Sequence, residues 1–258
     1  MFTAIYRAIG RRLASFLTKE SDSYQRIDAI TIAEVAASLR AGDVLLVEGN
    51  SRISTAIKYL SQSSWSHACL FVGASGEASD QLNLLEANLK YGVQLVSLDK
   101  YAVFNLRICR PVNLSDDEIE RLVATAKSKL GHRYDLKNVF DLLRYLIQKP
   151  AVPERYRRAM ISFGSGEPTQ AICSTVIAES FQSIDYPILP RRHAESKAKS
   201  ADEADVLGEV PLYYRRHFTH FTPRDFDLSP YFQIVKPSIE ASFDYHQMRW
   251  KERPDSNS

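Results

Sequence analysis

Five short apolar segments follow one another within the first half of the chain, and each has the length and composition of a β-strand. Stretches rich in turn-forming residues, GASGEASD and KYG, separate three of them. The pattern predicts a meandering antiparallel sheet, and it constrains the fold more than any other feature of the sequence. The predicted strands are residues 43–49, 66–72, 82–87, 93–98 and 104–110.

Helical signals surround these strands. The clearest helix spans residues 115–131, because Ser115 and Glu118 have capping-box spacing and Gly131 can end it. Thr31 and Glu34 predict a second capping box before a shorter helix. Further helices are expected over residues 51–64, over 135–148, and from Cys173 onward. The predicted fold class is therefore α+β, with a central antiparallel sheet and flanking helices.

The composition excludes several classes of protein. With 258 residues, 45% of them hydrophobic and 25% charged, the chain resembles an ordinary globular protein. Its net charge of +2 does not favour a nucleic-acid partner, and we expect none, although residues 213–221 (YYRRHFTHF) mix cations with aromatic rings. Three widely spaced cysteines argue against a disulfide framework or a zinc ribbon, and free thiols fit a reducing compartment.

The chain divides into three predicted parts: an amphipathic arm (1–27), a globular core (28–190), and a charged excursion with a C-terminal extension that packs on the core (191–258). In the arm, apolar residues share one side of a helix, while Arg7 and Arg11 lie opposite. Such an arm binds either an anionic membrane surface or protein, and both alternatives stay open. No secretory signal is evident, so we expect a cytoplasmic protein, with a peripheral place on the inner membrane face as an option.

Two polar residues stand out inside the predicted strands. Strand alternation places His67, Cys69 and Phe71 on one face of the sheet. A single histidine in such a strand is more often structural than functional. Glu86, however, lies in the next apolar strand, and a buried carboxylate requires a partner. An antiparallel neighbour would set Glu86 beside His67 and orient the imidazole; the alternative is a solvent-facing glutamate at the strand end.

Cys173 is the third candidate. It follows the predicted loop 151–171 and begins an amphipathic helix, where the helix dipole favours thiolate over thiol. Beside an imidazolium, its pKa would fall further and make it a nucleophile at neutral pH. Its own backbone N–H is then in position to bind an oxyanion. Cys69 and Cys109 lie among apolar strand residues and are interpreted as inert core thiols.

The order of these blocks resembles a known family, the circularly permuted papain-like hydrolases, which are YiiX- and YebB-like relatives of the NlpC peptidases. The resemblance covers residues 41–235 and implies a permuted papain-like (NlpC-type) fold. It implies Cys173 as nucleophile, His67 as general base and Glu86 as the residue that orients the histidine. The blocks are GDVLLVEGNSRISTAIKYLSQSSWSHACLFVG, LLEA, GHRYDL, CSTVIAESF and FTPRDFDLSPYF.

Other positions follow from the same resemblance. Tyr134 and Asp135 match the YD pair of the family, and Tyr134 is expected to line the cleft and to donate to the oxyanion. The neighbours of the candidate triad, Trp65, Ser66 and Ser174, are expected to bind substrate. His132 and Arg133 depart from the family pattern and put the shape of that loop in doubt. The reaction needs no metal and no organic cofactor, and H-x-C on a strand lacks the paired ligand spacing of the common zinc sites.

The sequence thus predicts a cysteine hydrolase that cleaves an amide or ester bond through a thioacyl-enzyme intermediate. Its partner would be an amide- or ester-containing substrate, either a peptide or a lipid. One alternative is a membrane-associated lipid acyl hydrolase or acyltransferase. The other is an inactive binding module that uses the same cleft.

Overall fold

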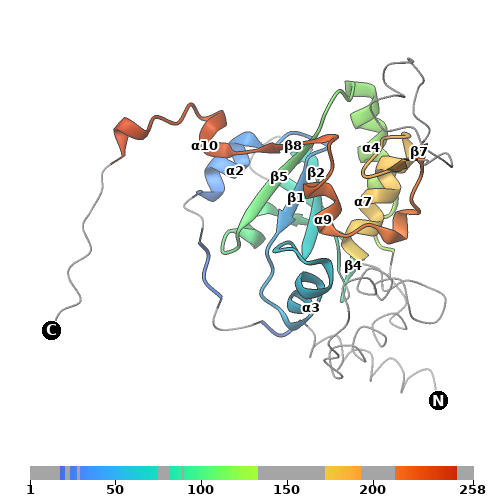
Figure 1. The fold of residues 1–258 in the computed structure, drawn as a ribbon, viewed down its shortest axis with the longest axis horizontal. Coiled ribbons are helices and arrows are strands. Elements are labelled where there is room, and N and C mark those ends of the chain that lie inside the picture. The colour runs from blue at the N-terminus through green and yellow to red at the C-terminus, as the bar shows by residue number, and fades with distance from the viewer. Residues whose placement is uncertain are drawn as a thin grey trace, which may run out of the picture.

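The computed structural model contains one central six-stranded sheet, in which every neighbouring pair is antiparallel (Figure 1). The strand order is β4-β3-β2-β1-β5-β8, so the predicted meander is confirmed and gains one further strand. The strands are β1 (Val44–Val47), β2 (His67–Ala74), β3 (Leu82–Asn88), β4 (Gly92–Ser97), β5 (Leu106–Pro111) and β8 (Phe232–Val235). The structure describes residues 18–20, 24–27, 30–74, 82–88, 90–132, 172–192 and 213–248.

Helices flank this sheet, which confirms the α+β class. Both predicted capping boxes are present: Thr31 begins α2 and Ser115 begins α4. A small hairpin, β6 (Arg191–Arg192) with β7 (Tyr213–Tyr214), stands apart from the main sheet. The helices are α2 (Ile32–Ser38), α3 (Arg52–Ser61), α4 (Asp116–Ser128), α7 (Ile172–Ser183), α9 (Pro223–Asp227) and α10 (Pro237–Glu240), with 3-10 turns η1 (Leu98–Tyr101), η2 (Phe218–His220) and η3 (Tyr245–Gln247).

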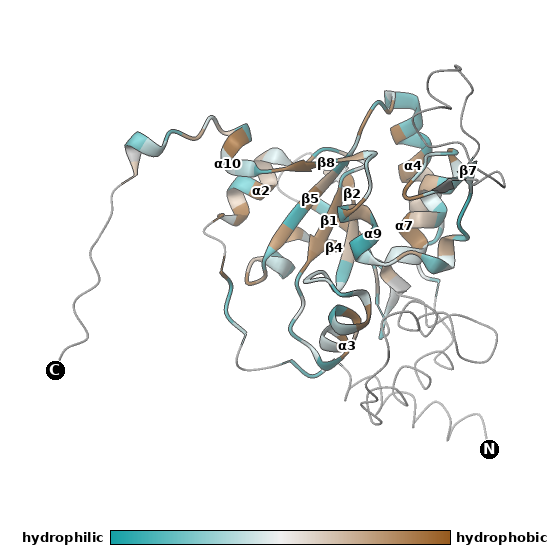
Figure 2. Cartoon of the chain, viewed as in Figure 1, coloured by the Kyte–Doolittle hydropathy of each residue, from teal (hydrophilic) through white to brown (hydrophobic). Residues whose placement is uncertain are grey.

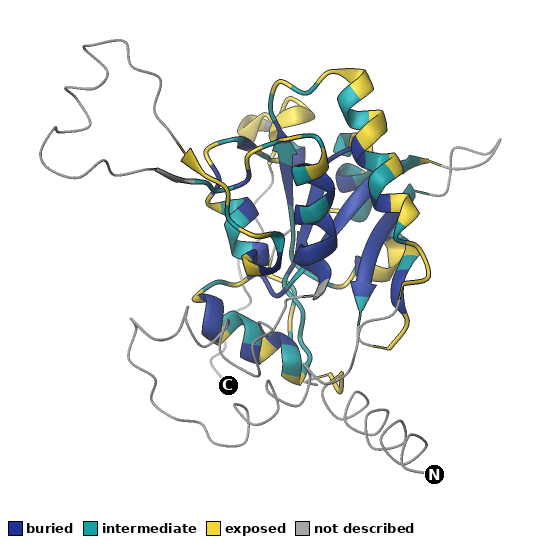
Figure 3. Cartoon of the chain, turned by 90° about the vertical axis from the view of Figure 1, so that its right-hand side faces the viewer, coloured by how far each residue is buried: buried dark blue, intermediate teal, exposed yellow. Residues whose placement is uncertain are grey.

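Two apolar layers cover the two faces of the sheet. Val44 and Leu46 of β1 face the layer formed with α4, α7 and α9, whereas Leu45 and Val47 face the layer formed with α2 and η1. Figure 2 shows the apolar character of the central strands, and Figure 3 shows that they are buried. In the first layer, the fully buried Phe181 of α7 packs against several aromatic rings. This packing fixes α7 against the sheet.

The C-terminal part of the chain also contributes to the sheet. Strand β8 pairs along β5, with Ile108 opposite Val235 and Pro111 opposite Phe232. The sequence did not predict a strand there, because FQIV is short and follows a proline. The three-part division of the chain stays a prediction. Within the described residues, no helix is both long and apolar enough to span a bilayer. The predicted arm up to residue 17, the helix over 135–148 and the loop 151–171 lie outside the described residues.

The ladder between β2 and β3 is incomplete. Leu70 pairs with Leu85 and Phe71 with Leu84, but within the described strands no pair lies beyond Leu70 toward the start of β2. Strand β3 nevertheless continues to pair with β4 as far as Asn88. The start of β2 and the end of β3 therefore have no mutual ladder pairs, which leaves an opening in the ladder, and the candidate site lies at this opening.

Candidate active site

His67 and Glu86 are in direct contact across the opening. His67 is the first residue of β2, and its Nε2 lies 3.2 Å from Oε2 of Glu86. The Glu86 side chain is only 1% exposed, whereas that of His67 is 20% exposed. The predicted pairing by a neighbouring antiparallel strand is therefore present, and the solvent-facing alternative for Glu86 is wrong.

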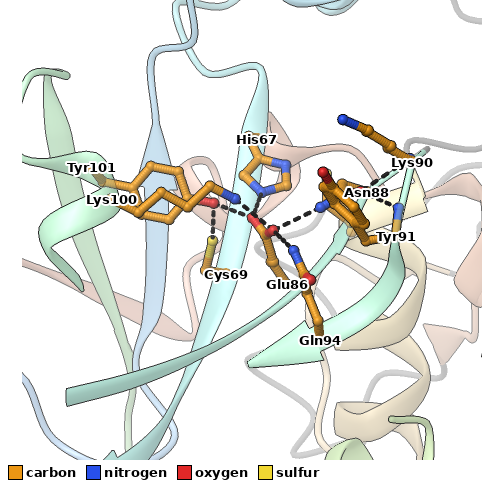
Figure 4. Close-up of polar contacts among 11 residues, drawn as sticks. His67, Cys69, Glu86, Asn88, Lys90, Tyr91, Gln94, Lys100 and Tyr101 are labelled. Carbon is orange, nitrogen blue, oxygen red and sulfur yellow. Dashed lines mark hydrogen bonds and ion pairs between the residues drawn. The ribbon is translucent and has the colours of Figure 1, made fainter. Parts of the chain in front are cut away.

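Glu86 is the centre of a dense hydrogen-bond network (Figure 4). Its Oε1 accepts from Asn88 Nδ2 at 2.8 Å, from Gln94 Nε2 at 2.7 Å and from the Lys100 ammonium at 2.5 Å. Its Oε2 accepts from the Tyr101 hydroxyl in addition to facing His67. Burial by itself raises the pKa of the carboxyl, but the interactions with His67, Lys100 and Tyr101 outweigh it and hold the pKa far below its usual range. Glu86 is therefore a fixed anion.

Cys173 approaches the same imidazole from another element. It is the second residue of α7, which packs on β2 and β3, and it is 5% exposed. Burial favours the neutral thiol, yet the pKa of Cys173 is lowered because the charge and hydrogen bond of His67 stabilise the thiolate. The backbone N–H of Ala68 and the hydroxyl of Ser174 act in the same direction.

The opened ladder explains why Ala68 is able to serve Cys173. Phe71 donates its N–H to Asp43 beside β1 at 2.8 Å, and the direction of strand N–H groups alternates. The N–H of Ala68 consequently points away from β1, toward β3. Because the β2–β3 ladder does not reach Ala68, this donor remains for the sulfur of Cys173. No sequence pattern predicts this contact.

The imidazole is thus held between an anion and thiols. Its Nε2 faces Glu86, and the ring also interacts with Cys69 and Cys173. Burial opposes the imidazolium, but electrostatic and hydrogen-bond interactions with the sulfurs of Cys69 and Cys173 raise the pKa of His67 well above its ordinary value. A raised imidazole pKa beside a lowered thiol pKa favours an ion pair of imidazolium and thiolate.

The other two cysteines are fully buried, as the sequence predicts. Burial raises the pKa of the Cys109 thiol strongly, so this thiol stays neutral. Cys69, in contrast, donates to the Tyr101 hydroxyl at 3.4 Å and interacts with His67. It is a buried thiol that belongs to the site, which the prediction of an inert core residue missed.

His67, Cys69 and Glu86 also form a group with the donor types of a metal site, since their ligand atoms lie within 4.8 Å of one another. Both oxygens of Glu86, however, already accept hydrogen bonds. The Lys100 ammonium, 2.5 Å from the carboxylate, would also repel a cation. These donors therefore fit a proton-transfer network better than a metal ion.

The structure places the predicted substrate-binding residues in different surroundings. Trp65 is buried and donates from Nε1 to Asp227 at 3.2 Å, while Ser66 accepts from the backbone of Gly49 at 2.9 Å. Ser174 is buried with its Oγ 3.9 Å from the sulfur of Cys173. A role of these three in binding substrate stays a prediction. Tyr134 and Asp135, with the loop that holds them, lie outside the described residues.

Part of this chain matches a known protein family. A family profile described as "Permuted papain-like amidase enzyme, YaeF/YiiX, C92 family" matches residues 38–145. The predicted family resemblance is confirmed. The match to the permuted papain-like amidases covers less than half of the chain, and it includes His67 and Glu86 but ends before Cys173. This match supports the assignment of the chain to the class of cysteine hydrolases.

Solved structures similar to this chain include yiiX from Escherichia coli O157:H7, described as a metalloprotein. The alignment has a TM-score of 0.46 and 19% sequence identity, and it covers 76% of this chain and 96% of the other. No curated protein matches the chain.

Proposed function

We propose that this protein is a cysteine hydrolase that cleaves an amide bond through a thioacyl-enzyme intermediate. The observation that carries the proposal is that His67 of β2 contacts Glu86 of β3 and also interacts with Cys173 of α7. The lowered pKa of Cys173 beside the raised pKa of His67 is the electrostatic arrangement of an activated thiol. The match to the amidase family supports the same reaction class.

In the first half of the reaction, the thiolate of Cys173 attacks the carbonyl carbon and a C–S bond forms. His67 gives its proton to the leaving nitrogen, and the C–N bond breaks. In the second half, the now neutral His67 takes a proton from water, the resulting hydroxide attacks the thioester, and the thiolate leaves. Glu86 holds the ring and stabilises each imidazolium state. The backbone N–H of Cys173, near the start of α7, is the candidate oxyanion donor.

Alkylation of the free protein tests the nucleophile. We expect iodoacetamide to modify Cys173 at neutral pH, and mass spectrometry of the digest identifies the position. Cys109→Ser is a matched control, because Cys109 is a buried thiol with a raised pKa. Cys173→Ser should abolish the fast labelling and Cys109→Ser should leave it unchanged. Fast labelling that survives in Cys173→Ser would remove Cys173 as the nucleophile.

Trapping of the acyl-enzyme tests the reaction. The protein is incubated with a panel of N-acyl amides and acyl esters, and an acyl-sized mass increase on Cys173 that hydroxylamine reverses identifies a thioester. Adducts from amides but not from esters would support an amidase. Adducts from phospholipids alone would favour the lipid acyl hydrolase or acyltransferase. A reactive Cys173 that accepts no acyl group and releases no product would favour the binding module.

The membrane alternative rests on residues 1–20 alone, a basic segment without an acidic residue before Glu20. Flotation with anionic liposomes, with and without these residues, tests it at two salt concentrations. Membrane binding predicts co-flotation that is lost on deletion and weakened by salt. Equal flotation of both forms would assign the arm to protein packing.

A further inference from the structure

One short turn supplies a contact to each oxygen of Glu86. In η1, Lys100 binds Oε1 at 2.5 Å and the next residue, Tyr101, donates to Oε2. The turn is itself fixed at its start, where the Ser97 hydroxyl accepts from the backbone of Asp99 at 3.3 Å. Two consecutive side chains therefore hold both ends of the carboxylate that orients the histidine.

The two side chains differ in their surroundings. Tyr101 is 4% exposed, and its ring packs 6.0 Å from the imidazole of His67 and 6.3 Å from the ring of Phe104. The Lys100 side chain is 43% exposed and reaches inward to an oxygen that is buried. Tyr101 thus fixes the direction of the carboxylate, whereas Lys100 adds a positive charge whose removal leaves no cavity in the core.

The charge of Lys100 has a consequence for proton transfer. A buried carboxylate that faces an imidazole without any counter-charge stabilises the imidazolium so strongly that it becomes a poor acid. A general acid works best when it gives up its proton near the working pH. An ammonium on the opposite oxygen offsets part of the negative charge and keeps the proton of His67 transferable.

We propose that Lys100 and Tyr101 are positioning residues, which act on His67 through Glu86 and set how readily its proton is transferred. This inference rests on the proposed function, in which His67 is the acid and base. The groups that face His67 are Cys69 of β2, Glu86 of β3, Tyr101 of η1 and Cys173 of α7, and Lys100 acts on this set through the carboxylate.

Titration of the His67 ring by NMR tests the inference without any need for substrate. The His67 signal is assigned by its loss in His67→Asn, which separates it from the other five of the six histidines. We expect Lys100→Met to move the His67 titration to higher pH by about 0.5 to 1 unit, because a half-exposed charge is partly screened by water. Tyr101→Phe should move it in the same direction. Lys100→Arg should restore the wild-type curve.

Lys58→Met is the matched control, because Lys58 also pairs with a glutamate, Glu48 at 3.4 Å, and is not one of the groups that bind Glu86. We expect this variant to leave the His67 curve unchanged. Coincident curves for Lys100→Met and the wild type would overturn the inference. If Tyr101→Phe does not fold, Lys100→Met still decides, because its side chain lies at the surface. Failure of the proposed function gives a different result, namely an unreactive Cys173 in the wild-type protein.

Discussion

Replacing Glu86 by glutamine removes the charge at the centre of the site and keeps the shape of the side chain. At the observed 3.2 Å, a pair of unit charges in an effective dielectric of about 20 interacts by roughly 5 kcal/mol. Lys100 neutralises part of this charge, and water reaches the imidazole. We therefore expect the imidazolium of His67 to lose about 1.4 to 2.7 kcal/mol of stabilisation. This loss corresponds to a decrease of about 1 to 2 units in the pKa of His67.

The sign follows from the charges. Glu86 and His67 interact through a hydrogen bond and their charges, so removing the anion lowers the pKa of His67, and the imidazolium loses its proton at a lower pH. The thiolate of Cys173 then loses the neighbouring imidazolium at a lower pH, and the pKa of Cys173 rises. The pH window in which the ion pair exists becomes narrower from both sides. In addition, the glutamine amide donates to Nε2 and so favours the tautomer with the proton on Nδ1, which is unsuited to accept the thiol proton.

Two measurements check this prediction. The rate of Cys173 alkylation as a function of pH reports the thiolate, and the NMR titration of His67 reports the imidazole. Glu48→Gln is the control, since Glu48 is a glutamate paired with a lysine at the surface. Thermal melting shows whether each variant folds. A folded Glu86→Gln variant with an unshifted His67 titration would refute the assignment of Glu86 as the charged partner.

Three further predictions concern the framework and the chemistry of the site. Arg110→Met leaves Asp43, only 1% exposed, without the arginine it pairs with, and should lower the free energy of unfolding in urea by about 3 to 5 kcal/mol. Because Asp43 can then take up a proton, this loss of stability should shrink on acidification. An equal loss at all pH values would contradict this reasoning. Gly49→Ala places a Cβ 2.5 Å from Ser54 Oγ and should cost about 1 to 3 kcal/mol, of which Ser54→Ala in the same chain should recover part. A metal chelator should leave the alkylation rate of Cys173 unchanged, whereas a loss that zinc restores would assign a metal to the site.

The sheet and its helices were predictable because their signals are local. Alternating apolar residues define strands, and the pairs Thr31 with Glu34 and Ser115 with Glu118 define helix starts within four residues. The partnership of His67 with Glu86 was predictable for a related reason: a carboxylate in an apolar strand requires a partner, and the neighbouring strand carries an imidazole.

The rest of the site depends on contacts that leave no local signal. Lys100 and Tyr101 lie in a turn after β4. Nothing in the sequence LDKY predicts that both side chains bind the same carboxylate. The same holds for Ala68, whose N–H matters only because the ladder beside it ends. Strand β8 was missed because its four residues, FQIV, include only three apolar ones and follow soon after a proline.

The end of the β2–β3 ladder explains how groups from the two faces of the sheet come together. His67 and Glu86 alternate with residues of the layer that packs against the α7 side, so their side chains belong to the α2 side of the sheet. Cys173 belongs to α7, on the opposite side. Two groups on opposite faces of a continuous sheet cannot exchange a proton, because a layer of paired backbone lies between them. They meet here because the β2–β3 ladder ends before Ala68, and the unpaired backbone at that point serves the sulfur. A chain that extended the pairing to Ala68 and Ala87 would retain all three side chains, yet we expect it to close the opening and to lose the reactivity of Cys173.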